Sequence, residues 1–183
     1  YLYLSLNFNP TFDKALFVQA RFFQILKNYE MTETIFKKIN HDSPSYLEAQ
    51  INIAINKKNM NMTNEAEKML ISLTLSYSNN YTLITALGDF YRKDKQYKKA
   101  IKYYSKAINL IKIDNQQPWK ILYMRGICFE RTNQWERAEK DFLEALKINP
   151  TMPQVLNYLA YGWIERNIFI NRSLEMLETA VQK

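Results

Sequence analysis

Two stretches of the chain repeat one pattern: GDFYRKDKQYKKAIKYYSKA at residues 88–107, and GICFERTNQWERAEKDFLEA at residues 126–145. Each begins with glycine, has aromatic residues three and nine positions later, and has alanine twelve positions after the glycine. A third aromatic residue and a second alanine follow at sixteen and nineteen positions. Six positions that agree in both spacing and residue type indicate an internal repeat of one supersecondary unit.

Three further stretches keep this spacing with less similar residues. The first copy consists of Ala20, Phe23, Tyr29, Thr32, Phe36 and Ile39. The last copy carries one inserted residue and consists of Ala160, Trp163, Ile170, Ser173, Leu177 and Ala180. The least regular copy has Ala54, Lys57, Ala66, Leu70 and Leu73, and its register stays open at this point. The repeat therefore extends over most of the chain.

The residue types of the repeat predict pairs of packed helices. Small residues let two helices approach closely, and aromatic residues three or four positions away fill the space beside them. Gly88 in mid-helix costs about 1 kcal/mol relative to alanine, so we expect close packing at this position. The polar stretches 93–96 and 132–134 predict the turn within a pair. The breaks between pairs are predicted at Pro44, Pro118, Pro150 and Pro153.

This spacing resembles the tetratricopeptide repeat, a helix–turn–helix unit of about 34 residues. The resemblance implies an all-α fold, a right-handed α-solenoid of antiparallel helix pairs that covers residues 1–183 as one fragment of a longer protein. The interval from Gly88 to Gly126 is four residues too long, which places an insertion around residues 114–117. The predicted repeats are 13–44, 45–80, 81–114, 115–150 and 151–183, and residues 1–12 are predicted to end a preceding repeat.

Composition excludes several kinds of chemistry. One Cys and one His cannot build a disulfide or an ordinary Cys/His zinc site. Three glycines are too few for a phosphate-binding loop. No apolar run approaches the length of about 18 residues that spans a bilayer. We therefore expect a non-catalytic protein with no metal and no cofactor.

Two short features carry reactive residue types. His41, Asp42 and Ser43 are the residue types of a hydrolytic triad, but a triad is assembled in space and seldom from adjacent residues. A turn in which Asp42 or Ser43 caps a helix is the simpler interpretation. Cys128 lies in an apolar helix and is interpreted as a small core residue rather than a reactive thiol.

The chain is basic, with 25 Lys and Arg against 18 Asp and Glu and a net charge of +7. Its densest basic run, 92–99, continues into Lys102 and Lys106 and alternates with tyrosines. Such alternation is found in sites for single-stranded nucleic acid. The tyrosines of this run occupy packing positions of the repeat, however, so a solvated helix face is the preferred interpretation.

In a stack of such repeats the first helices line a concave surface. Residues six and three positions before the small residue, and one and four after it, share one side of each first helix. This rule predicts a partner-binding groove of Lys14, Phe17, Arg21, Gln24, Thr85, Asp89, Arg92, Lys120, Tyr123, Ile127, Glu130, Asn157 and Tyr161. It also gives Thr82, Gln154 and Ile164, and in the second repeat Glu48, Ile51, Ile55 and Lys58. The predicted anchors are Phe17, Tyr123, Ile127 and Tyr161.

The predicted function is a scaffold or adaptor for protein–protein interaction, which binds a peptide or helix in this groove. The cations Lys14, Arg21, Arg92 and Lys120 favour an acidic partner. An RNA-binding helical repeat and a structural module that self-associates through its terminal helices, where Leu174, Leu177, Ala180 and Val181 share one face, remain alternatives. The stretch 156–166 resembles the closing repeat of bacterial proteins with many such units, which implies the bacterial cytoplasm or periplasm.

Overall fold

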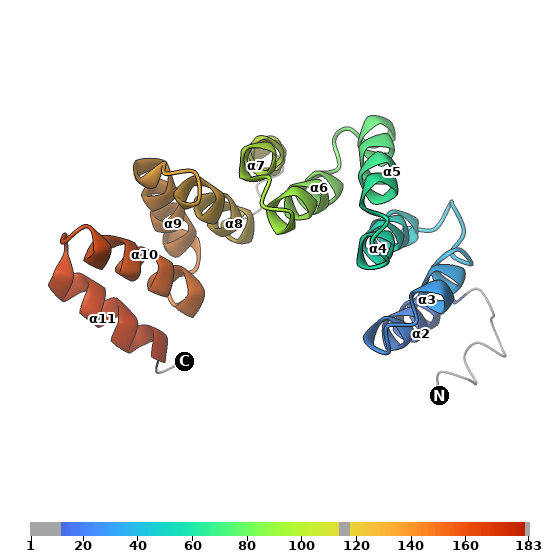
Figure 1. The fold of residues 1–183 in the computed structure, drawn as a ribbon, viewed down its shortest axis with the longest axis horizontal. Coiled ribbons are helices and arrows are strands. Elements are labelled where there is room, and N and C mark those ends of the chain that lie inside the picture. Colours follow the sequence, from blue (N-terminus) through green and yellow to red (C-terminus); the bar gives the residue numbers. More distant parts are fainter. Residues whose placement is uncertain (1–11, 114–117, 182–183) are drawn as a thin grey trace. The chain divides into compact units, whose positions relative to one another are not determined.

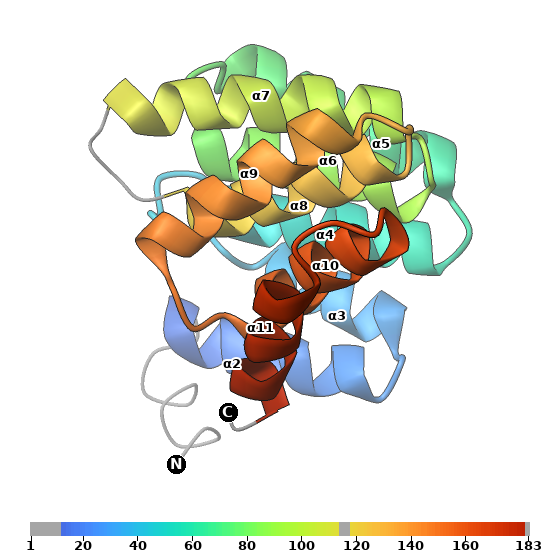
Figure 2. The same ribbon diagram turned by 90° about the vertical axis from the view of Figure 1, so that its left-hand side faces the viewer.

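The computed structural model describes residues 12–113 and 118–181, and these residues are all-helical, with no strand among them. The predicted end of a preceding repeat (1–12, except Phe12) and the predicted insertion at 114–117 lie outside the described residues. Within these described ranges, ten helices follow one another as antiparallel pairs (Figure 1; Figure 2). Their bounds are α2 Asp13–Ile25, α3 Tyr29–Phe36, α4 Tyr46–Asn59, α5 Thr63–Ser76, α6 Tyr81–Lys93, α7 Tyr97–Ile113, α8 Trp119–Glu130, α9 Trp135–Ile148, α10 Pro153–Glu165 and α11 Ile170–Val181.

The chain divides into two compact units, residues 1–78 and 79–183. Unit 1 contains the pairs α2–α3 and α4–α5, and unit 2 contains α6–α7, α8–α9 and α10–α11. We call the even-numbered helices first helices and the odd-numbered helices second helices. The core of unit 1 includes Leu16, Ala20, Ile35, Phe36, Ile39, Ala49 and Ile53, which come from both of its helix pairs.

The turns within the pairs share one feature, although the last turn also has a positive φ of 48° at Phe169. One residue of each turn has a positive φ between 55° and 62°: Lys27, Asn61, Lys95, Asn133 and Asn167. The next residue donates its N–H five residues back, for example Gln96 to the Tyr91 carbonyl and Gln134 to the Phe129 carbonyl, both at 2.9 Å. This bond satisfies a carbonyl at the end of the first helix and starts the second helix in the opposite direction.

The turns also fix the register of the second repeat. Lys27, Asn61 and Lys95 are 34 residues apart, and the Met62 N–H bonds to the Lys57 carbonyl at 2.9 Å as in the other turns. Ala54 is accordingly the small residue of this repeat and is completely buried. Lys57 therefore stands where the other first helices carry an aromatic residue.

Two of the small residues, Gly88 and Gly126, are points of close approach within their pairs. A Cβ atom on Gly88 would lie 2.7 Å from Tyr104 Cε1, and one on Gly126 would lie 2.6 Å from Phe142 Cε1. Both rings are completely buried in unit 2. The predicted reason for glycine in mid-helix, close packing, is confirmed.

One polar cluster joins the first two helix pairs of unit 2. Arg125 on α8 donates two hydrogen bonds of 2.7 Å to the two carboxylate oxygens of Asp141 on α9. Its Nη1 donates a third bond, 3.0 Å long, to the Ser105 hydroxyl on α7. The Asp141 side chain is only 5% exposed, so the pair is desolvated. Removing either partner would leave the other as an unpaired buried charge.

Gly126→Ala tests the close approach. We expect the free energy of unfolding to fall by about 1–3 kcal/mol, because the new methyl group overpacks against Phe142. Urea denaturation followed by circular dichroism measures the change. A Gly126→Ala/Phe142→Leu variant should recover part of the loss. A gain of about 1 kcal/mol, which helix propensity alone would give, would contradict this account.

Asp141→Ala tests the buried ion pair. The variant leaves the Arg125 guanidinium without a counter-ion, so we expect the free energy of unfolding to fall by about 3–5 kcal/mol. Arg125→Met/Asp141→Leu should restore most of it, because apolar side chains of similar volume replace the pair. Lys37→Ala, which breaks an ion pair whose lysine is 64% exposed, serves as the control and should cost less than about 1 kcal/mol.

Candidate functional site

A hollow of about 360 Å³ lies on the first-helix side of unit 2, where α8 and α9 meet α10. It is lined by Glu130, Arg131, Trp135, Asn157, Tyr158, Tyr161, Gly162 and Glu165. Three of these residues, Glu130, Asn157 and Tyr161, belong to the predicted groove. Tyr161 is 58% exposed, which leaves its ring accessible to a partner.

The wall of the hollow is rigid because Trp135 packs directly on the backbone of α10. A Cβ atom at Gly162 would lie 1.9 Å from Cη2 of the Trp135 ring, so only glycine leaves room for the indole. The Arg166 guanidinium lies 4.1 Å from the centroid of the same ring. A cation in this position is attracted by the ring and holds it in place.

The hollow also contains buried polar atoms whose hydrogen-bonding capacity is unused. Trp135 Nε1 and Glu130 Oε2 are buried and have no hydrogen-bond partner among the described residues. Glu130 Oε2 is 3.3 Å from Arg131 Nε, an ion pair without hydrogen-bond geometry. The Glu130 carboxylate raises the pKa of Arg131, and a hydrogen bond with Tyr158 adds to the effect. Both atoms are closed to solvent, so a ligand could reach them only if the side chains around them moved.

The four predicted anchors differ in how far their side chains are exposed to solvent. Tyr161 is exposed, whereas Tyr123 is half-buried and meets the edge of the Tyr158 ring at 5.7 Å. Burial raises the pKa of Tyr123, and the neighbouring Tyr158 contributes. Ile127 is 9% exposed, and Phe17 packs edge-to-face on buried Phe36 at 5.1 Å. Ile127 and Phe17 therefore pack mainly within their own units.

Two of the predicted charged residues hold the core tyrosine of the third repeat. The Tyr104 hydroxyl donates to Asp89 Oδ1 at 2.6 Å and accepts from Arg92 Nε at 3.1 Å. Burial raises the pKa of Tyr104, and the Asp89 carboxylate raises it further. The carboxylate and guanidinium thus satisfy a buried phenol that would otherwise lack partners.

The other predicted residues divide into exposed and internally bonded side chains. Lys14, Arg21, Glu48, Thr82, Lys120 and Gln154 are exposed; Ile55, Lys58 and Ile164 are half-buried, and Ile51 is buried. Gln24 Nε2 donates to the Oδ1 of fully buried Asn56 at 2.9 Å, which ties α2 to α4. The Thr85 hydroxyl donates to the Tyr81 carbonyl at 2.8 Å.

Sequence reasoning missed five residues of the lining: Arg131, Trp135, Tyr158, Gly162 and Glu165. Trp135 occupies a packing position of the repeat, which gave no reason to place it at a surface hollow. Gly162 stands two positions after the small residue, where other first helices carry Asn56, Phe90 and Cys128. The sequence did contain one signal for this contact: a glycine at this position together with an aromatic residue, Trp135, at the start of the preceding second helix.

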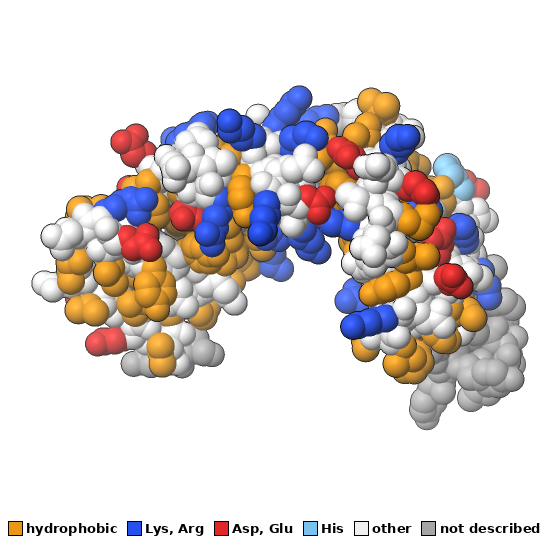
Figure 3. Space-filling model, viewed as in Figure 1, with side chains coloured by type: hydrophobic (Ala, Val, Ile, Leu, Met, Phe, Trp, Pro, Cys, Tyr) orange, Lys and Arg blue, Asp and Glu red, His pale blue; other side chains and the backbone are white. Residues whose placement is uncertain are grey.

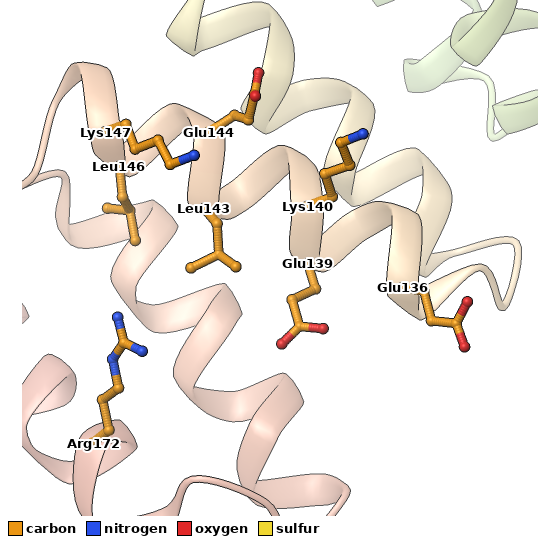
Figure 4. Close-up of a pocket in the computed structure, with 8 residues that line it drawn as sticks. All are labelled: Glu136, Glu139, Lys140, Leu143, Glu144, Leu146, Lys147 and Arg172. Carbon is orange, nitrogen blue, oxygen red and sulfur yellow. The ribbon is translucent and has the colours of Figure 1, made fainter.

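A larger hollow of about 660 Å³ lies on the second-helix side of the same unit, between α9 and α11 (Figure 4). Its lining combines Leu143 and Leu146 with three acidic and three basic side chains, Glu136, Glu139, Glu144, Lys140, Lys147 and Arg172. Glu139 accepts the indole N–H of Trp163, and the Arg172 guanidinium lies 5.2 Å from that ring. Balanced charges and internally bonded walls make it the weaker candidate.

His41, Asp42 and Ser43 do not form the hydrogen bonds of a hydrolytic triad. The Ser43 hydroxyl donates to Asp13 instead of His41, and it accepts the Ser45 N–H at 3.0 Å just before α4. His41 and Asp42 are 3.7 Å apart on the surface. No group of three metal-ligating side chains occurs in the described part of the chain. Within the same residues, every helix is too short or too polar to span a membrane.

Comparison with known proteins identifies the repeat. The sequence model of the tetratricopeptide repeat matches residues 81–151. These residues are therefore similar to tetratricopeptide repeats. A search of curated protein sequences finds no match. Tetratricopeptide repeats are in general non-catalytic scaffolds for protein–protein interaction, so protein partners are expected in general.

Solved structures show the same fold beyond the matched segment. MamA from Desulfovibrio magneticus (residues 41 to the end) has a TM-score of 0.69 at 14% identity, over 94% of this chain and 96% of that chain. PilF from Pseudomonas aeruginosa has a TM-score of 0.78 at 16% identity, over 92% and 75%. Cut9 with Hcn1, from the APC/C, has a TM-score of 0.75 at 15% identity, over 100% and 35%. The predicted all-α tetratricopeptide-repeat solenoid is confirmed.

Cys128 provides a test of the packing around the site. It is completely buried, and burial raises the pKa of its thiol to about 12. Because the thiolate is the reactive form, we expect a thiol-specific disulfide reagent at pH 8 to modify the native protein at least about a hundredfold more slowly than the urea-unfolded chain. Absorbance of the released thiolate measures both rates. Rates within tenfold of each other would contradict the burial.

Proposed function

We propose that the chain is a non-catalytic scaffold that binds a peptide or helical segment on the first-helix side of unit 2. The observation that carries the proposal is the 360 Å³ hollow, which joins the predicted residues Glu130, Asn157 and Tyr161 to the Trp135 wall. The five predicted repeats, 13–44 to 151–183, form one solenoid in this proposal.

The chemistry of the hollow suits a polypeptide. Tyr and Trp dominate the energetics of protein interfaces because they bury a large rigid surface and can also hydrogen-bond. A peptide group offers one acceptor and one donor. The Asn157 amide and the Tyr161 hydroxyl, whose residues line the hollow, can donate to and accept from such a group.

The predicted preference for an acidic partner rests on exposed cations. On unit 2 Lys120 is exposed and can meet a carboxylate, whereas Arg92 already bonds to Tyr104. Lys14 and Arg21 are exposed on unit 1. Charges at the rim of an interface mainly accelerate association. We therefore expect acidic residues flanking the bound segment to raise its association rate more than its lifetime on the scaffold.

Tyr161→Ala tests the proposal. A random peptide library is panned against the wild-type chain, and the best peptide is labelled for fluorescence anisotropy. We expect the variant to bind this peptide at least about thirtyfold more weakly, because a central aromatic anchor contributes about 2 kcal/mol or more. Circular dichroism verifies that the variant folds.

Phe22→Ala is the matched control, since it removes an aromatic residue that is 55% exposed on α2, outside the hollow. Its affinity should stay within threefold of wild type. Selection of peptides that bind Tyr161→Ala as tightly as wild type would place the binding surface elsewhere. Binding of single-stranded RNA that depends on Tyr161, with no selected peptide, would favour the RNA-binding alternative.

A further inference from the structure

Nearly all of the excess positive charge of the chain lies in one stretch. Residues 93–112 contain seven lysines and one aspartate, a net charge of +6, and the whole chain carries +7. The rest of the sequence is therefore close to neutral. The stretch forms the turn after α6 and most of α7, and α7 carries no acidic residue. Basic side chains cluster on the edge of unit 2 where this helix lies (Figure 3).

The lysines of α7 share one exposed side. Lys98, Lys99, Lys102 and Lys106 are exposed, and we call them the lysine face. At 100° per residue they lie within about 100° of arc, and Lys98, Lys102 and Lys106 follow one another at about 6 Å along the helix axis. The opposite side of α7 is buried through Ala100, Tyr104, Ala107, Ile108 and Ile111. The helix that carries the lysine face is thus anchored by its buried side, and the Lys99 ammonium group lies 4.8 Å from the centroid of the Tyr91 ring on α6.

The lysine face lacks the features of a protein or single-strand interface. None of the exposed large hydrophobic side chains among the described residues lies on α7. Interface cores are depleted in lysine and enriched in aromatic residues and arginine. None of the four tyrosines of this region is a fully exposed platform for bases: Tyr104 and Tyr91 are buried, Tyr103 stacks on Tyr91 at 5.4 Å, and Tyr97 is half-buried. No arginine lies on α7 to form bidentate contacts with phosphate or guanine.

We propose that the lysine face binds the anionic surface of a lipid bilayer, without insertion. A rigid row of point charges on flexible stems, with no apolar or aromatic anchor, suits a flat and diffuse layer of negative headgroups. Each lysine held near such a surface strengthens binding by about fivefold, and salt weakens the attraction. The interaction leaves the first-helix hollow free, so it is independent of the proposed peptide binding.

Vesicle flotation tests the proposal. The probes are vesicles of about 70% phosphatidylcholine and 30% phosphatidylglycerol, and vesicles of phosphatidylcholine alone. We expect the wild-type chain to float with the anionic vesicles only, and to be released by 0.5 M salt. Lys98→Gln/Lys102→Gln/Lys106→Gln should weaken binding about a hundredfold. Circular dichroism shows that this variant retains the wild-type helix content.

The control variant Lys38→Gln/Lys68→Gln/Lys140→Gln changes the net charge by the same amount at positions on α5, on α9 and after α3. It should bind within threefold of wild type, as should Tyr161→Ala. Absence of binding to the anionic vesicles, or an equal loss in the control variant, would overturn the proposal. A 20-base-pair DNA duplex that binds more tightly than the vesicles and depends on the same lysines would assign the face to nucleic acid instead.

Discussion

The contact between a small residue on each first helix and a large one on its partner governs this structure. At Gly88 and Gly126 the partner rings, Tyr104 and Phe142, lie where a Cβ atom would be. A distance this short fixes the position of the second helix along and around the first. Because packed interiors resist both cavities and overpacking, each pair behaves as one rigid block. The blocks then determine where every surface residue lies.

Rigid pairs allow one fold to carry two surfaces of different character. The first-helix side of unit 2 has a hollow with aromatic residues in its lining. The second helix α7 presents four exposed lysines and none of the exposed large hydrophobic side chains among the described residues. A surface of the first kind selects among partners, whereas a surface of the second kind concentrates the protein near anything strongly negative.

The periodicity of the sequence made the fold predictable, but it did not indicate the hollow on the first-helix side of unit 2. Spacing of glycine, alanine and aromatic residues is a local signal, so the helix pairs and the close approach at Gly88 followed from the sequence. The hollow depends on Trp135 reaching across to Gly162 in the next repeat, a contact between different repeats that spacing within one repeat does not encode. The Arg125–Asp141 pair occurs in a single repeat, so a repeated sequence pattern could not predict it. The register of the second repeat could be assigned only from the turn geometry at Asn61, because a lysine replaces the aromatic residue in this repeat.

The hydrogen bonds around Tyr104 have a consequence for mapping the surface by mutagenesis. Asp89 and Arg92 have partly exposed side chains, 40% and 24%, yet both bond to the hydroxyl of a completely buried tyrosine. An alanine scan would remove support from the core at either position, and a loosened α6–α7 pair would lower the apparent affinity for any ligand. Such residues would be scored as contacts although they touch no partner. In a Tyr104→Phe background the ring has no hydroxyl that needs hydrogen-bond partners. Replacing Asp89 or Arg92 there would not remove support from the core, so any remaining loss of affinity would report a contact with the partner.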